Sequence, residues 1–110
     1  MDLTYIFCKF VKTTITLSYT FMKKHMKIYI TGKVQKVGFR FYAMQAAYRY
    51  GVLGFAKNQL DGSVYLEVEG KAKAIHDFIE WCKNGPPGSV VSDVKLEEGE
   101  IKDYTEFEIR

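Results

Sequence analysis

A regular alternation of apolar and polar positions begins at Met26. In the run KIYITGKV the apolar side chains recur at the period of two that is typical of a half-buried β-strand. These apolar positions are Ile28, Ile30 and Val34. Residues 35–38 break the alternation, and residues 39–50 then contain three alanines and an aromatic side. That spacing predicts a helix that ends at Gly51, a residue suited to a helix C-terminus.

A hairpin and a second helix follow. Residues 52–59 and 63–69 favour two strands, which the tight turn at residues 60–62 joins. Beyond them apolar residues return at helical spacing, while charged residues occupy the other sides. The apolar positions of this helix are Ala72, Ile75, Phe78, Ile79 and Cys82. The sequence Gly-Pro-Pro-Gly at residues 85–88 ends it.

Two further strands complete the pattern, one at residues 90–96 and a short one at residues 104–109. The predicted order is βαββαβ with a short extra C-terminal strand. Each helix has one apolar face, which it must bury against the sheet. The pattern therefore predicts an α+β fold, a ferredoxin-like sandwich whose antiparallel sheet carries both helices on one face. Binding modules and enzymes both use this fold, so the function has to be argued from a site.

Residues 1–25 differ from the rest of the chain in composition: they are rich in Thr and other β-branched residues, and lysines interrupt their apolar stretches. We expect a mobile N-terminal extension here, followed by one domain over residues 26–110. Asp2 and the interrupting Lys9 and Lys12 are not typical of a signal peptide. A length of 110 residues with 47% apolar content suits a single compact domain. No apolar run approaches the roughly 20 residues that span a bilayer, so no membrane partner is expected.

The net charge of +3 comes from the extension, which holds four lysines and one aspartate. Residues 26–110 contain 12 basic and 12 acidic residues. A nucleic-acid-binding domain usually carries a concentrated basic face, so no nucleic-acid partner is expected. Cys8 and Cys82 form neither a CxxC motif nor a Cys/His ligand spacing, which indicates no metal site and a reducing, cytoplasmic compartment. Cys82 is expected to be a small buried apolar residue.

Familiar catalytic motifs are absent from the sequence. There is no GxSxG, no HExxH and no paired Cys/His nucleophile. His25 is assigned to the extension, and His76 to the solvated side of the second helix. The acidic pair Glu97-Glu98 lies beside a polar turn and is expected to be solvated. Catalysis, if any, has to come from another kind of site.

The segment Gly32–Arg40 (GKVQKVGFR) passes directly from a strand into the start of a helix. Such a crossing exposes main-chain N–H groups, which together with the helix dipole suit a phosphate. Arg40 would add a fork of donors matched to two phosphate oxygens. A cation near a helix N-terminus is disfavoured by about 0.3–1 kcal/mol, so an arginine there is better explained by a bound anion. From spacing alone, an exposed first-turn arginine without a ligand stays an alternative.

This run, together with Gly54–Asn58 (GFAKN), residues 62–64 (GSV) and Gly70, resembles the two signature stretches of the acylphosphatases. The resemblance covers residues 26–110. It implies that the loop at residues 35–40 binds phosphate and that Asn58 orients the attacking water. The implied phosphate-binding residues are Gln35, Lys36, Val37, Gly38, Phe39 and Arg40. It further implies an acyl phosphate as substrate, inorganic phosphate as product and competitor, no metal or other cofactor, and a monomer.

One position departs from the family pattern. Lys36 stands where the family usually has glycine, and a positive φ there would cost a lysine about 1–2 kcal/mol. The alternative to an enzyme is a non-catalytic ferredoxin-like module that binds RNA or protein. For RNA, bases would stack on a sheet surface with Tyr29, Phe55 and Tyr65 exposed.

Overall fold

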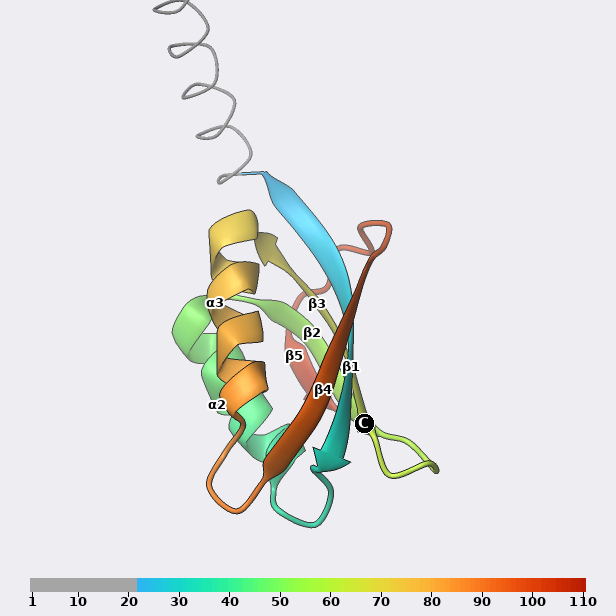
Figure 1. Ribbon diagram of the computed structural model, residues 1–110. Coiled ribbons are helices and arrows are strands. Elements are labelled where there is room, and N and C mark those ends of the chain that lie inside the picture. The colour runs from blue at the N-terminus through green and yellow to red at the C-terminus, as the bar shows by residue number, and fades with distance from the viewer. Residues whose placement is uncertain (1–21) are drawn as a thin grey trace, which may run out of the picture.

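The computed structural model describes residues 22–110, in which a five-stranded sheet carries two helices on one face (Figure 1). The elements are β1 (Lys23–Lys33), α2 (Phe39–Tyr50), β2 (Leu53–Asn58), β3 (Val64–Lys71), α3 (Ala72–Asn84), β4 (Val90–Glu98) and β5 (Phe107–Ile109). The expectations for Cys8, and for residues 1–21 of the extension, lie outside the described residues. Neither described helix is long and apolar enough to cross a membrane.

The strand order across the sheet is β4-β1-β3-β2-β5. The four longer strands pair antiparallel, and both helices lie on one side of them (Figure 1). The predicted α+β ferredoxin-like arrangement, with its short extra C-terminal strand, is therefore confirmed. One refinement is that β5 pairs parallel with β2, so the sheet as a whole is mixed.

The core lies between the sheet and the two helices. Ile28 and Ile30 of β1 are fully buried in it, as the alternating pattern predicts. The alanines of α2 supply a small buried face, which lets the helix approach the sheet closely. Cys82 of α3 is also fully buried, as expected, and this burial raises the pKa of its thiol.

The strand β1 begins at Lys23, ahead of the start expected at Met26. It therefore includes His25, which pairs with Glu69 of β3 and is 2% exposed. The assignment of His25 to the N-terminal extension is thus wrong. The apolar alternation did not indicate this, because His25 is a polar residue on the sheet face that points away from the helices, where its partners are acidic.

A buried polar cluster surrounds His25 on that open face. Its ring nitrogens lie 2.7 Å from a Glu69 carboxylate oxygen and 2.8 Å from one of Glu67. Lys102 and Tyr104, from the segment between β4 and β5, also donate hydrogen bonds to these two carboxylates. Because an ionised carboxylate only accepts hydrogen bonds, each of these two contacts calls for a ring N–H as the donor. Through these hydrogen bonds the cluster connects β1, β3 and residues 99–106.

The two glutamates are held in their charged forms. Burial disfavours a charge on Glu67, but hydrogen bonds from Tyr65, Lys102 and Tyr104 outweigh it and lower the pKa of Glu67 to about 2. Burial is likewise outweighed at Glu69, where hydrogen bonds from the Lys102 N–H and from His25 lower the pKa of the carboxyl. The cluster is therefore an ionic one at neutral pH.

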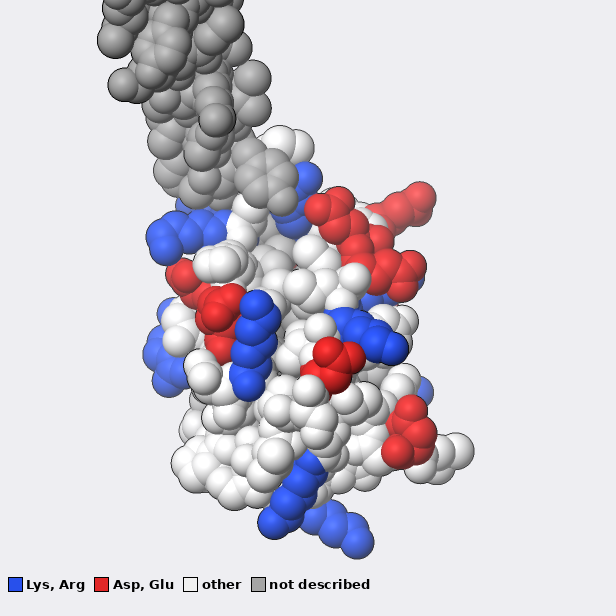
Figure 2. Space-filling model, viewed as in Figure 1, with Lys and Arg blue, Asp and Glu red and all other residues white. Residues whose placement is uncertain are grey.

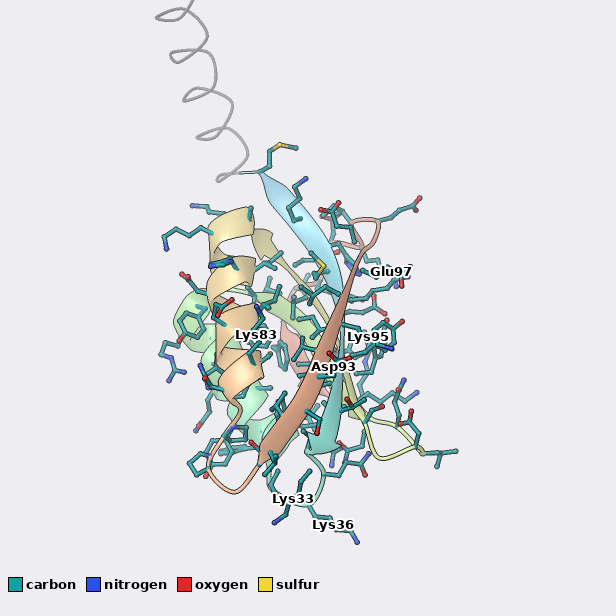
Figure 3. All side chains as sticks on the ribbon, viewed as in Figure 1. Lys33, Lys36, Lys83, Asp93, Lys95 and Glu97 are labelled. Atoms are coloured by element: carbon teal, nitrogen blue, oxygen red, sulfur yellow. The ribbon has the colours of Figure 1, made fainter. Side chains whose placement is uncertain are left out.

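The outer strand β4 carries charges of alternating sign on its open face. Figure 3 shows Asp93, Lys95 and Glu97 following one another along this strand. All three are exposed, and Lys95 pairs with Tyr29 of β1. On the side of the molecule that Figure 2 shows, basic and acidic side chains are interspersed. The expectation that the Glu97-Glu98 pair is solvated is confirmed by its exposure.

Candidate active site

A pocket of about 260 Å³ lies where the loop after β1 and the first turn of α2 meet the ends of β2 and β5. Six of the expected site residues line it: Gln35, Lys36, Gly38, Phe39, Arg40 and Asn58. Three further residues that the pattern did not indicate also line it: Val34, Phe41 and Ile109. The side chain of Val37 instead packs against the core. The structure thus brings the strand-to-helix loop and Asn58 to one cavity.

The loop backbone is left-handed at two positions. Lys36 has φ 63°, so the positive φ considered for this position is present. Gly38, with φ 74° and ψ 22°, is the N-cap of α2. The first hydrogen bond of the helix runs from the Tyr42 N–H to the Gly38 carbonyl at 3.0 Å, which leaves the preceding N–H groups without a helical acceptor. This end of α2, with no acidic residue in its first turn, suits an anion.

The Gln35 side chain holds the loop in place. Its amide nitrogen donates to the main-chain oxygens of Gln59 at 2.7 Å and Ser63 at 2.9 Å, in the turn between β2 and β3. Both side-chain N–H groups are therefore used within the fold. Gln35 positions the loop next to Asn58, a role that the sequence pattern did not indicate.

Arg40 is oriented across the pocket by the last residues of the chain. Its guanidinium donates to the main-chain oxygen of Arg110 at 2.8 Å. The Arg110 N–H in turn donates to the Ala56 carbonyl at 2.8 Å, which continues the pairing of β5 with β2. One guanidinium nitrogen is used in this way, and the other N–H groups stay available for a ligand.

Asn58 is the last residue of β2, where it pairs with Val64 of β3. It is half-buried and lines the pocket. Its side-chain amide forms no hydrogen bond with any of residues 22–110. Both a donor and an acceptor are therefore open to a ligand or to water.

The pocket is electrostatically positive. Lys36 and Arg40 line it, and no carboxylate from the described part of the chain does. Lys33, the last residue of β1, and Lys36, in the loop after it, both extend at the lower end of the molecule (Figure 3). On the face shown in Figure 2 this end displays basic side chains without acidic ones. Such a field raises the local concentration of anions.

The surface that RNA would need differs from the expected one. Phe55 is 5% exposed, and the guanidinium of Arg110 lies 3.9 Å from its ring centroid. Tyr65 is half-buried and donates to Glu67 at 2.6 Å. The expectation that Phe55 is exposed for stacking is therefore wrong, because the chain end covers it.

A second and larger pocket, of about 410 Å³, lies between β1, β4 and α3. Met26, Ile75 and Ile79 give it an apolar lining, and the exposed His76 stands among its charged and polar neighbours. Within residues 22–110, no group of three or more His, Cys, Asp or Glu residues is arranged to hold a metal ion.

Comparison with known proteins points to one family. The acylphosphatase family model matches residues 26–109. The acylphosphatase of Archaeoglobus fulgidus is 37% identical over 84 residues, which are 76% of this chain and 94% of that protein. That of Aliivibrio fischeri is 41% identical over 80 residues, 73% of this chain and 89% of its own length.

Solved structures agree with this result. The structure of an acylphosphatase from Coxiella burnetii matches with a TM-score of 0.78 and 34% identity, over 80% of this chain and 93% of that one. The chain belongs to the acylphosphatase family.

Proposed function

We propose that this protein hydrolyses acyl phosphates to a carboxylate and inorganic phosphate in the pocket after β1. The observation that carries the proposal is that Arg40 and Asn58, which lie on different elements, line one positive cavity at the N-terminus of α2. Membership of the acylphosphatase family supports the reaction type.

The loop at residues 35–40 binds the phosphoryl group. Main-chain N–H groups at the start of α2 donate hydrogen bonds to its oxygens, and the Arg40 guanidinium neutralises their charge. Because phosphoryl transfer has a loose transition state with charge on the equatorial oxygens, fixed donors at these positions stabilise it. The hydrogen bond from Arg40 to the Arg110 carbonyl supports this role, since it limits the rotamers of the long side chain.

Asn58 places the water. Its amide can accept from one water proton and donate to a second oxygen, which aligns the water in line with the acyl oxygen. The water oxygen forms the new bond to phosphorus while the bond between phosphorus and the acyl oxygen breaks. The acyl oxygen leaves as a carboxylate, and the water proton passes to the phosphate. The neutral amide of Asn58 is not a base.

A carboxylate is already a good leaving group, so the reaction as proposed needs no metal. Hydrolysis of benzoyl phosphate should then be unaffected by a chelator such as EDTA.

The experiment measures benzoyl phosphate hydrolysis, with inorganic phosphate as competitor. Arg40→Ala should weaken phosphate inhibition by roughly 10- to 100-fold, since charged hydrogen bonds are lost. Asn58→Ala should lower kcat by about 100-fold or more and leave phosphate inhibition nearly unchanged. Arg49→Ala is the matched control, because Arg49 lies in the last turn of α2 and does not line the pocket.

Failure of the folded wild-type protein to hydrolyse benzoyl phosphate above background would refute the proposed function. Equal losses of phosphate affinity in Arg40→Ala and Asn58→Ala would refute the division of roles between the two residues.

A further inference from the structure

We propose that Phe41 and Ile109 form an acyl-binding wall that makes this protein prefer acyl phosphates with an apolar, especially aromatic, acyl group. The inference rests on the function proposed above. It concerns the acyl group of the substrate, which the proposed function leaves unspecified.

Most side chains that line the pocket already pack in the core, form hydrogen bonds within the fold or have a role in the proposed reaction. Val34 and Phe39 are buried in the core, and the Gln35 amide is bonded to the turn between β2 and β3. Arg40 and Asn58 are assigned to the phosphate and the water. The side chains left to contact an acyl group are the cationic Lys36 and the apolar pair Phe41 and Ile109.

The two apolar side chains are both partly open to solvent. Phe41 is 50% exposed and Ile109 is 44% exposed, although both border a cavity. Single exposed apolar residues are common on protein surfaces and need no explanation. Two of them at the rim of one anion-binding pocket indicate a surface that is covered when the ligand is bound.

The two side chains lie next to the two residues assigned to the reaction, one beside Arg40 and the other on the strand that pairs with the strand of Asn58. Phe41 directly follows Arg40 in the first turn of α2, and its ring packs edge-on against Tyr42 at a centroid distance of 5.8 Å. Ile109 pairs with Ala56, two residues before Asn58 on β2. The wall is therefore built from the element that binds the phosphate and from the strand beside the water-placing residue.

A large apolar acyl group would bind more tightly because of contacts with this wall, whereas the methyl group of an acetyl phosphate would make few such contacts. Burying the surface of one aromatic ring, together with an edge contact to Phe41, favours an aromatic acyl group by about tenfold or more. Lys36 attracts any anion and does not distinguish these acyl groups from each other.

The test compares kcat/KM for benzoyl phosphate and acetyl phosphate in the full-length protein. The wild-type protein should prefer benzoyl phosphate. Phe41→Ala and Ile109→Ala should each lower the ratio of the two values by about three- to tenfold. The loss should appear mainly as a raised KM for benzoyl phosphate, because the wall contacts the acyl group before and during the reaction alike. Phe41→Tyr should keep the wild-type ratio.

Tyr48→Ala is the matched control, since Tyr48 is another exposed aromatic residue of α2 that does not line the pocket. Its ratio should equal that of the wild type. Circular dichroism establishes that each variant is folded.

An unchanged ratio in both Phe41→Ala and Ile109→Ala would overturn the inference while leaving the proposed function intact. A wild-type preference for succinyl phosphate over benzoyl phosphate that Lys36→Ala removes would also overturn it, in favour of an acyl group selected by charge. If the wild type hydrolyses none of these compounds, the proposed function itself fails, and this inference fails with it.

Discussion

Lys36 holds a left-handed backbone at φ 63° in the phosphate loop. A non-glycine side chain in this conformation lowers the stability of the fold by about 1–2 kcal/mol. A glycine would avoid this strain, but part of the gain would be offset by its greater conformational freedom in the unfolded chain. We expect Lys36→Gly to be about 1 kcal/mol more stable than Lys36→Ala, which removes the same charge but keeps the strain. Urea unfolding of both variants measures the difference.

Lys33 provides the comparison, because it lies in β1 and has no positive φ. There the order should be reversed, with Lys33→Ala more stable than Lys33→Gly. The same sign at both positions would mean that the loop backbone is not strained.

Glu67 should make the stability of the protein depend on acid. Its pKa is lowered to about 2 in the fold, from an ordinary value of 4.5. A lowered carboxyl pKa stabilises the fold fully above the ordinary value, and this contribution is lost as the pH falls towards 2. A difference of this size corresponds to about 3 kcal/mol. The stability gap between wild type and Glu67→Gln should therefore shrink between pH 5 and pH 2.

Urea unfolding at a series of pH values measures this gap. The control is Glu100→Gln, which removes an exposed carboxylate from the segment that covers the cluster. A gap that stays constant down to pH 2 would show that Glu67 is not the group responsible.

At the scale of elements, β5 connects the sheet edge to the phosphate site. Deleting Arg110 removes the main-chain oxygen that holds Arg40, so phosphate inhibition should weaken by about three- to tenfold. Arg110→Ala keeps that oxygen and loses the contact with the Phe55 ring. It should change phosphate inhibition by less than about twofold. Equal effects of the two changes would mean that the side chain, and not the main chain, orients Arg40.

The sequence predicted the elements well where apolar periodicity is strong. The helix at Phe39–Tyr50 was placed at its observed bounds, and the amphipathic face of α3 is buried as expected. The parallel pairing of β5 was not predictable, because three residues carry too little pattern to show a partner or a direction. Ile109 was missed as a pocket residue for the same reason.

The site was predictable to a similar extent. The loop and Arg40 follow from a strand that runs into a helix, and Asn58 followed from the family motif. The role of Gln35 depends on main-chain oxygens of a distant turn, which have no signature in the sequence. His25 was misassigned because the sequence alone does not distinguish a buried histidine between two glutamates from a polar residue on the surface.

At the scale of the whole molecule, the N-terminal boundary of the folded unit can be tested by two truncations. We expect a chain of residues 22–110 to hydrolyse benzoyl phosphate within about twofold of the full chain, because it keeps β1 and the pocket. A chain of residues 26–110 lacks His25 and leaves two buried carboxylates without the hydrogen-bonding ring that lies between them. Its free energy of unfolding should fall by roughly 3–5 kcal/mol.

The variant His25→Ala in the longer chain should reproduce most of that loss, as measured by urea unfolding. If residues 26–110 were as stable as residues 22–110, the cluster would contribute little, and the domain boundary expected at Met26 would hold.

The charges on the outer strand β4 affect the tendency of this protein to aggregate at high concentration. An edge strand of a sheet offers unpaired main-chain groups to any other strand, which is a common route to aggregation. A second copy that paired in antiparallel fashion with β4 would bring its own Asp93, Lys95 and Glu97 beside the same three residues. In the register that places Lys95 opposite its own copy, Asp93 faces Glu97 and every facing pair among them carries like charges. At the opposite edge β5 is three residues long and offers little to pair with. The charged side chains of β4 and the shortness of β5 therefore both discourage the addition of strands at the edges of the described sheet.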